Sequence, residues 1–136
     1  MSLTLTDQDK ITLRTAAYGA VSLLAAAGVA GGSPHRIATD GSLALASATG
    51  PVGHVLAEKT TGVPLTGKTV AAIADQVLPA LTEAMRLLTK QSPAEAAAFR
   101  DIVLLAVEAA TQRQKGDVSP TITDMIRKIT AALDAA

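Results

Sequence analysis

The sequence predicts an all-α fold, a single-domain bundle of five or six helices. Apolar residues recur at three- and four-residue spacing along most of the chain, and no segment alternates apolar with polar residues as a half-buried strand would. Helix-capping residues separate these stretches, and three Ser-Pro dipeptides each place a capping hydroxyl before a proline at the first helical position. A length of 136 residues suits one domain with one core.

The first helix is expected over residues 7–27. Thr6 is a good N-cap, and Asp7 and Asp9 fall in the first turn, where the helix dipole favours acids. Gly28 is predicted to end the helix in the left-handed conformation. The chain carries no charge from Thr15 to Pro34, but it is too weakly apolar there to insert as a membrane span. We therefore expect a helix buried in the protein, and no membrane association.

Residues 34–48 and 51–60 are expected to form two shorter helices. Glycines interrupt this part of the chain at positions 41, 50 and 53, and Pro51 follows the second of them. The Gly50–Pro51 junction is therefore predicted to bend the chain between the two helices.

The fourth helix is expected over residues 67–89, with Thr66 as its N-cap. Its apolar period continues unbroken across Pro79, so this proline is predicted to kink the helix rather than end it. Two further helices are expected over 93–115, opened by a Ser92–Glu95 capping box, and over 120–134. The apolar stripe of the last helix is formed by Ile122, Met125, Ile126, Ile129 and Leu133.

Composition excludes several function classes. Twelve basic and twelve acidic residues give a net charge of zero, and the bases are spread along the chain, which argues against a nucleic-acid partner. The absence of cysteine excludes disulfides, thiolate metal sites and cysteine catalysis. The N-terminal segment MSLTLTDQDK has neither the basic nor the apolar region of a signal peptide, and we expect a cytoplasmic protein.

Residues 62–69 read GVPLTGKT and match the phosphate-binding pattern G-x-x-x-x-G-K-[ST]. In a true P-loop, the Gly67 backbone and the Lys68 side chain would contact phosphates, and the Thr69 hydroxyl would ligate magnesium. The motif must follow a buried strand, yet it is preceded by the polar stretch AEKTT, and no parallel sheet is predicted. We expect the match to be fortuitous and no cofactor to be bound. Simple anion binding by Gly67, Lys68 and Thr69 at a helix N-terminus stays open as an alternative.

The two histidines suggest one other kind of site. His54 and Glu58 lie four residues apart, as metal ligands on a helix often do, with His35 or Asp40 available as a third ligand. Two histidines without cysteine are a small ligand set, and a solvated surface pair is the simpler interpretation. No serine lies in a G-x-S-x-G elbow and no nucleophile–base pair is evident, so no catalytic residue is predicted.

Four segments carry a resemblance that covers nearly the whole chain: LTDQDKITLRTAAYGAVSLLAAA, GSLALASATGPVGHVLAEK, VAAIADQVLPALTEAMRLL and RKITAALDAA. Together they resemble an uncharacterised family of small, alanine-rich helical proteins from actinobacteria. The resemblance implies a cytoplasmic bacterial protein. It implies no activity and assigns no catalytic or binding residue.

The surplus of small apolar helix faces leads to the main functional hypothesis, a non-enzymatic helical interaction module that self-associates as a homodimer or larger oligomer. The helix bearing Val103, Val107 and Ala110 is expected to contribute an exposed pairing face. The alternative is a small-molecule or anion binding protein with its site between Pro34 and Thr69, where both histidines and the P-loop match fall.

Overall fold

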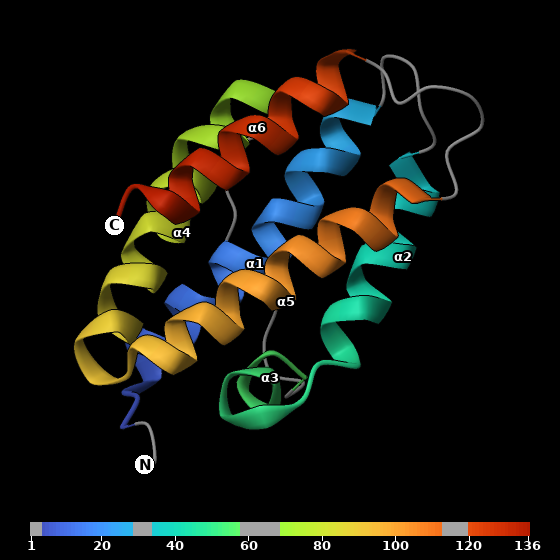
Figure 1. The fold of residues 1–136 in the computed structure, drawn as a ribbon. Coiled ribbons are helices and arrows are strands. Elements are labelled where there is room, and N and C mark those ends of the chain that lie inside the picture. The colour runs from blue at the N-terminus through green and yellow to red at the C-terminus, as the bar shows by residue number, and fades with distance from the viewer. Residues whose placement is uncertain (1–3, 29–33, 58–68, 113–119) are drawn as a thin grey trace.

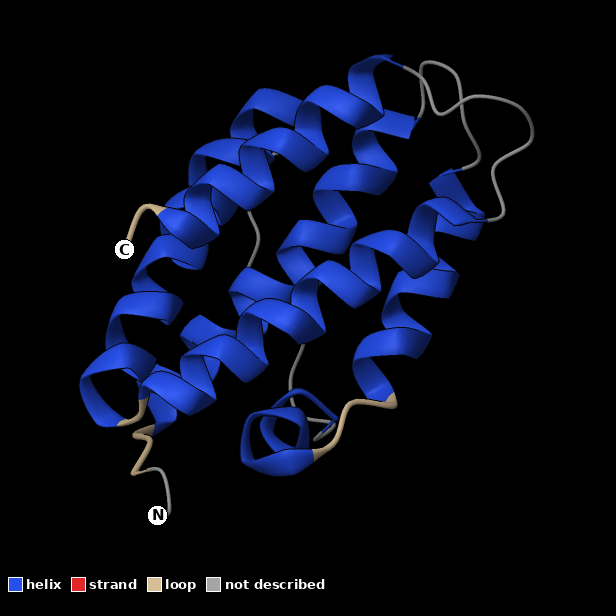
Figure 2. Ribbon diagram, in the orientation of Figure 1, coloured by secondary structure: helices blue, strands red, loops and turns tan. Residues whose placement is uncertain are grey.

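A computed structural model describes residues 4–28, 34–57, 69–112 and 120–136 of the protein. These residues form six helices and no strand, which confirms the predicted all-α bundle (Figures 1 and 2). The helices are α1 (Asp7–Ala27), α2 (Pro34–Ala46), α3 (Gly50–Ala57), α4 (Val70–Gln91), α5 (Pro93–Gln112) and α6 (Pro120–Asp134).

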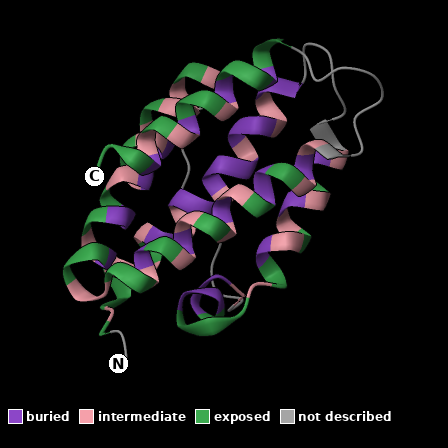
Figure 3. Ribbon diagram, in the orientation of Figure 1, coloured by how far each residue is buried: buried purple, intermediate pink, exposed green. Residues whose placement is uncertain are grey.

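Helix α1 is the centre of the bundle and contacts each of the other five helices. It is buried on several sides along its uncharged part, where Figure 3 shows little exposed surface. Its small side chains let neighbouring helices approach closely. A Cβ atom added to Gly19 would lie 2.7 Å from Val77 Cγ2 in α4, and one added to Gly41 of α2 would lie 2.7 Å from Val21 Cγ1 in α1. Among the described helices, none combines the length and apolar character needed to cross a bilayer.

The two ends of α1 differ in how well they were predicted. Thr6 caps the N-terminus as expected: its Oγ1 accepts from the Asp9 N–H at 3.0 Å, and Asp9 Oδ2 accepts from the Thr6 N–H at 3.1 Å. The expected left-handed end at Gly28 was wrong. Gly28 has φ −72° and ψ −12°, in the right-handed helical region, and its N–H points at the carbonyls of Leu24, Ala25 and Ala26. The helix therefore ends in a tightened last turn that needs no left-handed residue.

The bend between α2 and α3 lies where it was predicted. Gly50 has φ +83°, the only positive φ among the described residues. Helix α2 ends at Ala46, two residues earlier than expected. In the connection, the Ala48 backbone approaches α3 so closely that a Cβ atom on Gly53 would lie 2.6 Å from the Ala48 carbonyl carbon. This contact requires glycine at position 53.

Helix α4 begins later than expected. Thr69, and not Thr66, is the N-cap: its Oγ1 accepts from the Ala72 N–H at 3.1 Å, and the helix starts at Val70. The prediction that α4 continues across Pro79 is confirmed, since the helix extends to Gln91 with the proline exposed on its outer side.

Ser92 alone connects α4 to α5. Its N–H donates to the Leu88 carbonyl at 2.7 Å and ends α4, while its Oγ accepts from the Glu95 N–H at 3.4 Å and caps α5. The predicted capping box is therefore only half formed. The Ser92 N–H is already engaged by Leu88, and Glu95 Oε1 is buried with no hydrogen-bond partner in the described part of the chain.

The last two helices complete one shared core. Helix α5 turns Phe99 and a row of small apolar residues inward, and α6 contributes Ile122, Met125, Ile129 and Leu133. Val103, Val107 and Ala110, which mark the helix expected to contribute an exposed pairing face, are core residues themselves, with side chains 1%, 4% and 0% exposed. They face inward because α5 is packed against α1, α2 and α4. That α5 contributes a pairing face stays a prediction.

Candidate functional site

The residues of the P-loop match are only partly covered by the structure. Gly67 and Lys68 lie outside the described residues, and their roles stay predictions. Thr69 is described, and its hydroxyl accepts the Ala72 N–H as the cap of α4. Its backbone is extended, with φ −93° and ψ 156°. The described segments contain helices and loops but no strand, so they do not supply the parallel strands on which a P-loop is built.

The metal-site hypothesis is likewise only partly covered. Glu58 lies outside the described residues, and His35 is placed by its backbone in the first turn of α2. His54 is exposed on α3, and Asp40 is half-buried on α2. In the described ranges, no three histidine, aspartate or glutamate side chains gather closely enough to hold a metal ion.

A pair of polar contacts fastens α3 to the central helix. Arg14 Nε donates to the Val55 carbonyl at 3.1 Å, and the Tyr18 hydroxyl donates to the Leu56 carbonyl at 2.7 Å. These carbonyls lie in the last turn of α3, where they have no partner within the helix. Burial raises the pKa of Tyr18, and the nearby positive charge of Arg14 acts in the opposite direction.

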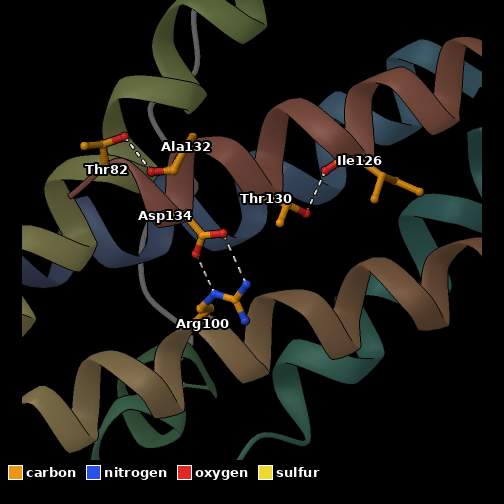
Figure 4. A network of polar contacts seen from close by, with 6 residues as sticks. All are labelled: Thr82, Arg100, Ile126, Thr130, Ala132 and Asp134. Carbon is orange, nitrogen blue, oxygen red and sulfur yellow. Dashed lines mark hydrogen bonds and ion pairs between the residues drawn. The ribbon is translucent and has the colours of Figure 1, made fainter.

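A second set of polar contacts joins three helices at the C-terminal end of α6 (Figure 4). The Thr82 hydroxyl of α4 donates to the Ala132 carbonyl at 2.7 Å. Arg100 of α5 pairs with Asp134, Nε to Oδ1 at 2.9 Å and Nη2 to Oδ2 at 3.4 Å. The hydrogen bond from Arg100 lowers the pKa of Asp134, and the same bond raises the pKa of Arg100. Both groups of contacts hold helices together, and neither presents a nucleophile beside a base.

Three large apolar side chains remain exposed among the described residues. Leu43 on α2 is 62% exposed, Leu105 on α5 is 61% exposed, and Ile11 on α1 is 39% exposed. Helices α2 and α5 pack side by side, and α2 has no contact with α6 (Figure 1). Leu43 and Leu105 thus project outward from two adjacent helices.

Neither leucine was predicted from the sequence to be exposed, and helical phase explains their positions once the buried rows are known. The core face of α2 is defined by Ile37, Gly41 and Leu45, and at 3.6 residues per turn Leu43 falls on the opposite side. Leu105 likewise falls opposite the buried row of α5 that contains Phe99 and Val103.

Comparison of the chain with protein-family models, with curated proteins and with solved structures finds no match in any of the three. Function is therefore inferred from the sequence and from the described surface.

Proposed function

We propose that this protein is a non-enzymatic helical interaction module that self-associates through the outer surface formed by α2 and α5. The supporting observation is the exposure of Leu43 and Leu105 on two adjacent helices of a bundle whose other large apolar side chains are mostly covered in the described residues. Contiguous exposed apolar surface marks association sites, whereas leucines exposed singly are common, so the proposal requires that Leu43 and Leu105 are covered together.

The free energy gained by covering the leucines, set against the cost of association, favours a weak, reversible complex. Full burial of a leucine stabilises by about 1.5 to 3 kcal/mol, so covering the exposed parts of four leucines, two from each copy, contributes roughly 4 to 7 kcal/mol. The loss of rotational and translational freedom opposes this by about 4 kcal/mol or more. Further contacts around the leucines are needed to reach micromolar affinity, which corresponds to about 8 kcal/mol.

Electrostatics do not oppose the association of two copies. The net charge is zero, so no long-range repulsion separates identical chains. The resemblance to uncharacterised actinobacterial proteins adds a cytoplasmic bacterial setting to the proposal.

Sedimentation velocity over roughly 1 μM to 1 mM tests the proposal. We expect the weight-average mass of the wild-type protein to rise with concentration. The double variant Leu43→Ser, Leu105→Ser is expected to stay monomeric with an unchanged helical circular dichroism spectrum. Ile11→Ser is the matched control, since it removes the third exposed apolar side chain from a different helix. A wild-type protein that stays monomeric throughout the range contradicts the proposal.

Native mass spectrometry with magnesium-ATP tests the alternative on the same samples. A stoichiometric ATP adduct that Lys68→Ala abolishes would support anion binding at the GVPLTGKT segment in place of the interaction module.

A further inference from the structure

We infer that the corner between α4 and α5 is a two-state switch that controls whether the N-terminal strap is held against the bundle. The N-terminal strap is defined here as Thr4 and Leu5, which lead into α1. In the extended state, which the structure shows, the backbone N–H of Ser92 donates to the Leu88 carbonyl. In the boxed state, the same N–H donates to the carboxylate of Glu95. The switch does not depend on the self-association proposed above.

The capping box of α1 shows what the start of α5 lacks. In α1, Thr6 has φ −74° and ψ 167°, and both arms of its box with Asp9 are formed, at 3.0 and 3.1 Å. At α5 only the arm from the Glu95 N–H to Ser92 Oγ is present, and it is long, at 3.4 Å. Ser92 has φ −161° and ψ 108°, so its backbone is rotated away from the conformation of the complete box. Position 92 therefore has the sequence of a capping box but is held as the end of α4.

One donor faces two acceptors at this corner. In the extended state the Ser92 N–H bonds the Leu88 carbonyl at 2.7 Å, and Glu95 Oε1 is buried without a hydrogen-bond partner among the described residues. In the boxed state Glu95 is satisfied, and the carbonyl of Leu88, a fully buried residue, loses its donor. Each state leaves one acceptor unpaired at a cost in free energy, and the stronger bond to a carboxylate favours the boxed state. The two states are therefore close in free energy.

The strap keeps the corner in the extended state. Gln91 Nε2 donates to the Thr4 carbonyl at 2.7 Å, and Gln91 Oε1 accepts from the Thr4 N–H at 2.8 Å. These two bonds join residues 87 positions apart, and Figure 1 shows the N-terminal segment beside the connection between α4 and α5. Leu5 adds an apolar contact, since it packs against the core. Gln91 is the last residue of α4, directly before the N–H that changes partner.

The exchange and the strap are coupled through one peptide unit. The bond from Ser92 to Leu88 closes the last turn of α4, and this turn contains Gln91. Moving the N–H to Glu95 rotates the peptide that joins Gln91 to Ser92, and it releases the backbone that aims the Gln91 amide at the strap. Such coupling is reciprocal: the boxed state loosens the strap, and loss of the strap favours the boxed state. The corner thus converts the position of the strap into the length of α4 and the start of α5.

Relaxation dispersion of backbone amide nitrogens measures the exchange, because it detects sparsely populated states on the microsecond-to-millisecond timescale. We expect wild type to show dispersion at Ser92 and Glu95 and none at Thr6 and Asp9, whose box is complete. Glu95→Ala removes the second acceptor and is expected to abolish the dispersion at Ser92. Gln91→Ala removes both bonds to the strap and is expected to raise the boxed population at least about fivefold.

Lys90→Ala is the matched control, because Lys90 lies in the same last turn of α4 and takes no part in the two bonds to the strap. We expect its dispersion to equal that of wild type. An equal rise in Lys90→Ala and Gln91→Ala would show ordinary fraying of α4 and overturn the inference. Dispersion at Ser92 that persists in Glu95→Ala, or a boxed population in Gln91→Ala within about twofold of the wild-type value, would overturn it as well.

Scalar coupling across the hydrogen bond identifies the acceptor directly. In wild type we expect the Ser92 nitrogen to couple to the carbonyl carbon of Leu88. In Gln91→Ala this coupling is expected to weaken as the boxed population rises. Coupling of the wild-type Ser92 nitrogen to the carboxyl carbon of Glu95 instead would show that the boxed state predominates with the strap in place, and it would overturn the inference.

Discussion

The hydroxyl of Tyr18 in α1 donates a 2.7 Å hydrogen bond to the carbonyl oxygen of Leu56 in α3. The two residues are 38 positions apart in the chain, and the bond satisfies a carbonyl that the end of α3 leaves without a helical partner. Together with the bond from Arg14 to Val55, it fastens the shortest described helix to the most buried one.

Removal of this hydroxyl is expected to destabilise the fold modestly. Tyr18→Phe keeps the ring but leaves the Leu56 carbonyl without its donor, which lowers the free energy of unfolding by about 1 kcal/mol. Urea unfolding followed by circular dichroism measures the change. A free energy of unfolding within about 0.3 kcal/mol of the wild-type value would show that water replaces the bond at no cost.

Ionisation of the Tyr18 hydroxyl is also expected to lower the stability of the fold at alkaline pH. Burial raises the folded-state pKa of Tyr18 above its ordinary value of 10.0. The protonated hydroxyl therefore contributes stability that is fully present below pH 10.0, and this contribution is lost as the pH rises through the folded-state pKa. The free energy of unfolding, measured from neutral to alkaline pH, is expected to fall more steeply in wild type than in Tyr18→Phe. Parallel pH curves for the two proteins would contradict this assignment.

The pair of Arg100 and Asp134 predicts the opposite pH dependence. The hydrogen bond from Arg100 lowers the pKa of Asp134 below its ordinary value of 3.8, so the pair stabilises the fold above pH 3.8 and the effect is lost as the pH falls through the folded-state pKa. Asp134→Asn is therefore expected to be less stable than wild type at neutral pH and equal to it in strong acid. Because both side chains are exposed, we also expect molar salt to shrink the difference at neutral pH. Thermal unfolding of both proteins at two pH values and two salt concentrations tests this.

The hydrogen bond from Thr82 to Ala132 is a useful comparison, because its contribution to stability is expected not to depend on salt. Thr82→Val removes the donor to the Ala132 carbonyl, and it is expected to cost about 1 kcal/mol at any salt concentration, because neither partner is charged. Salt-dependent destabilisation of this variant would indicate that α6 is held by charges rather than by this hydrogen bond.

The close approach of α2 to α1 predicts a rescue experiment. Gly41→Ala places a methyl group 2.7 Å from Val21 Cγ1 and 2.8 Å from Cγ2, which overpacks the contact by about 1 to 3 kcal/mol. Val21→Ala removes the obstruction, so the double variant is expected to be more stable than the sum of the two single effects predicts. Gly53→Ala is the contrasting variant: its methyl group meets the Ala48 backbone at 2.6 Å, and no side-chain substitution relieves it. Additive effects of Gly41→Ala and Val21→Ala in denaturant unfolding would contradict the packing model.

Local features of the fold were predictable because their causes are local. The Thr6 cap, the bend at Gly50 and the continuation of α4 across Pro79 depend on residues within one or two turns. The choice of Thr69 over Thr66 as a cap has a local cause too, because the apolar period of α4 begins directly after Thr69 and a cap at Thr66 would place a glycine in the first turn.

Features that depend on how the helices pack were not predictable in the same way. Val103 and Val107 are buried because all five of the other described helices contact α5, which the spacing of its apolar residues does not reveal. The fastening of α3 by Arg14 and Tyr18 joins residues about forty positions apart and leaves no pattern in the sequence. Helical phase explains the exposure of Leu43 and Leu105 once the buried row of each helix is known.

The contact between Tyr18 and Leu56 has an optical consequence. The chain contains one tyrosine and no tryptophan, so its near-ultraviolet absorption and emission come almost entirely from this one ring. The spectrum is therefore a site-specific reporter of the junction between α1 and α3, with no label added. A titration in which the emission stays constant while the sedimentation coefficient rises would show two chains associating without disturbing that junction.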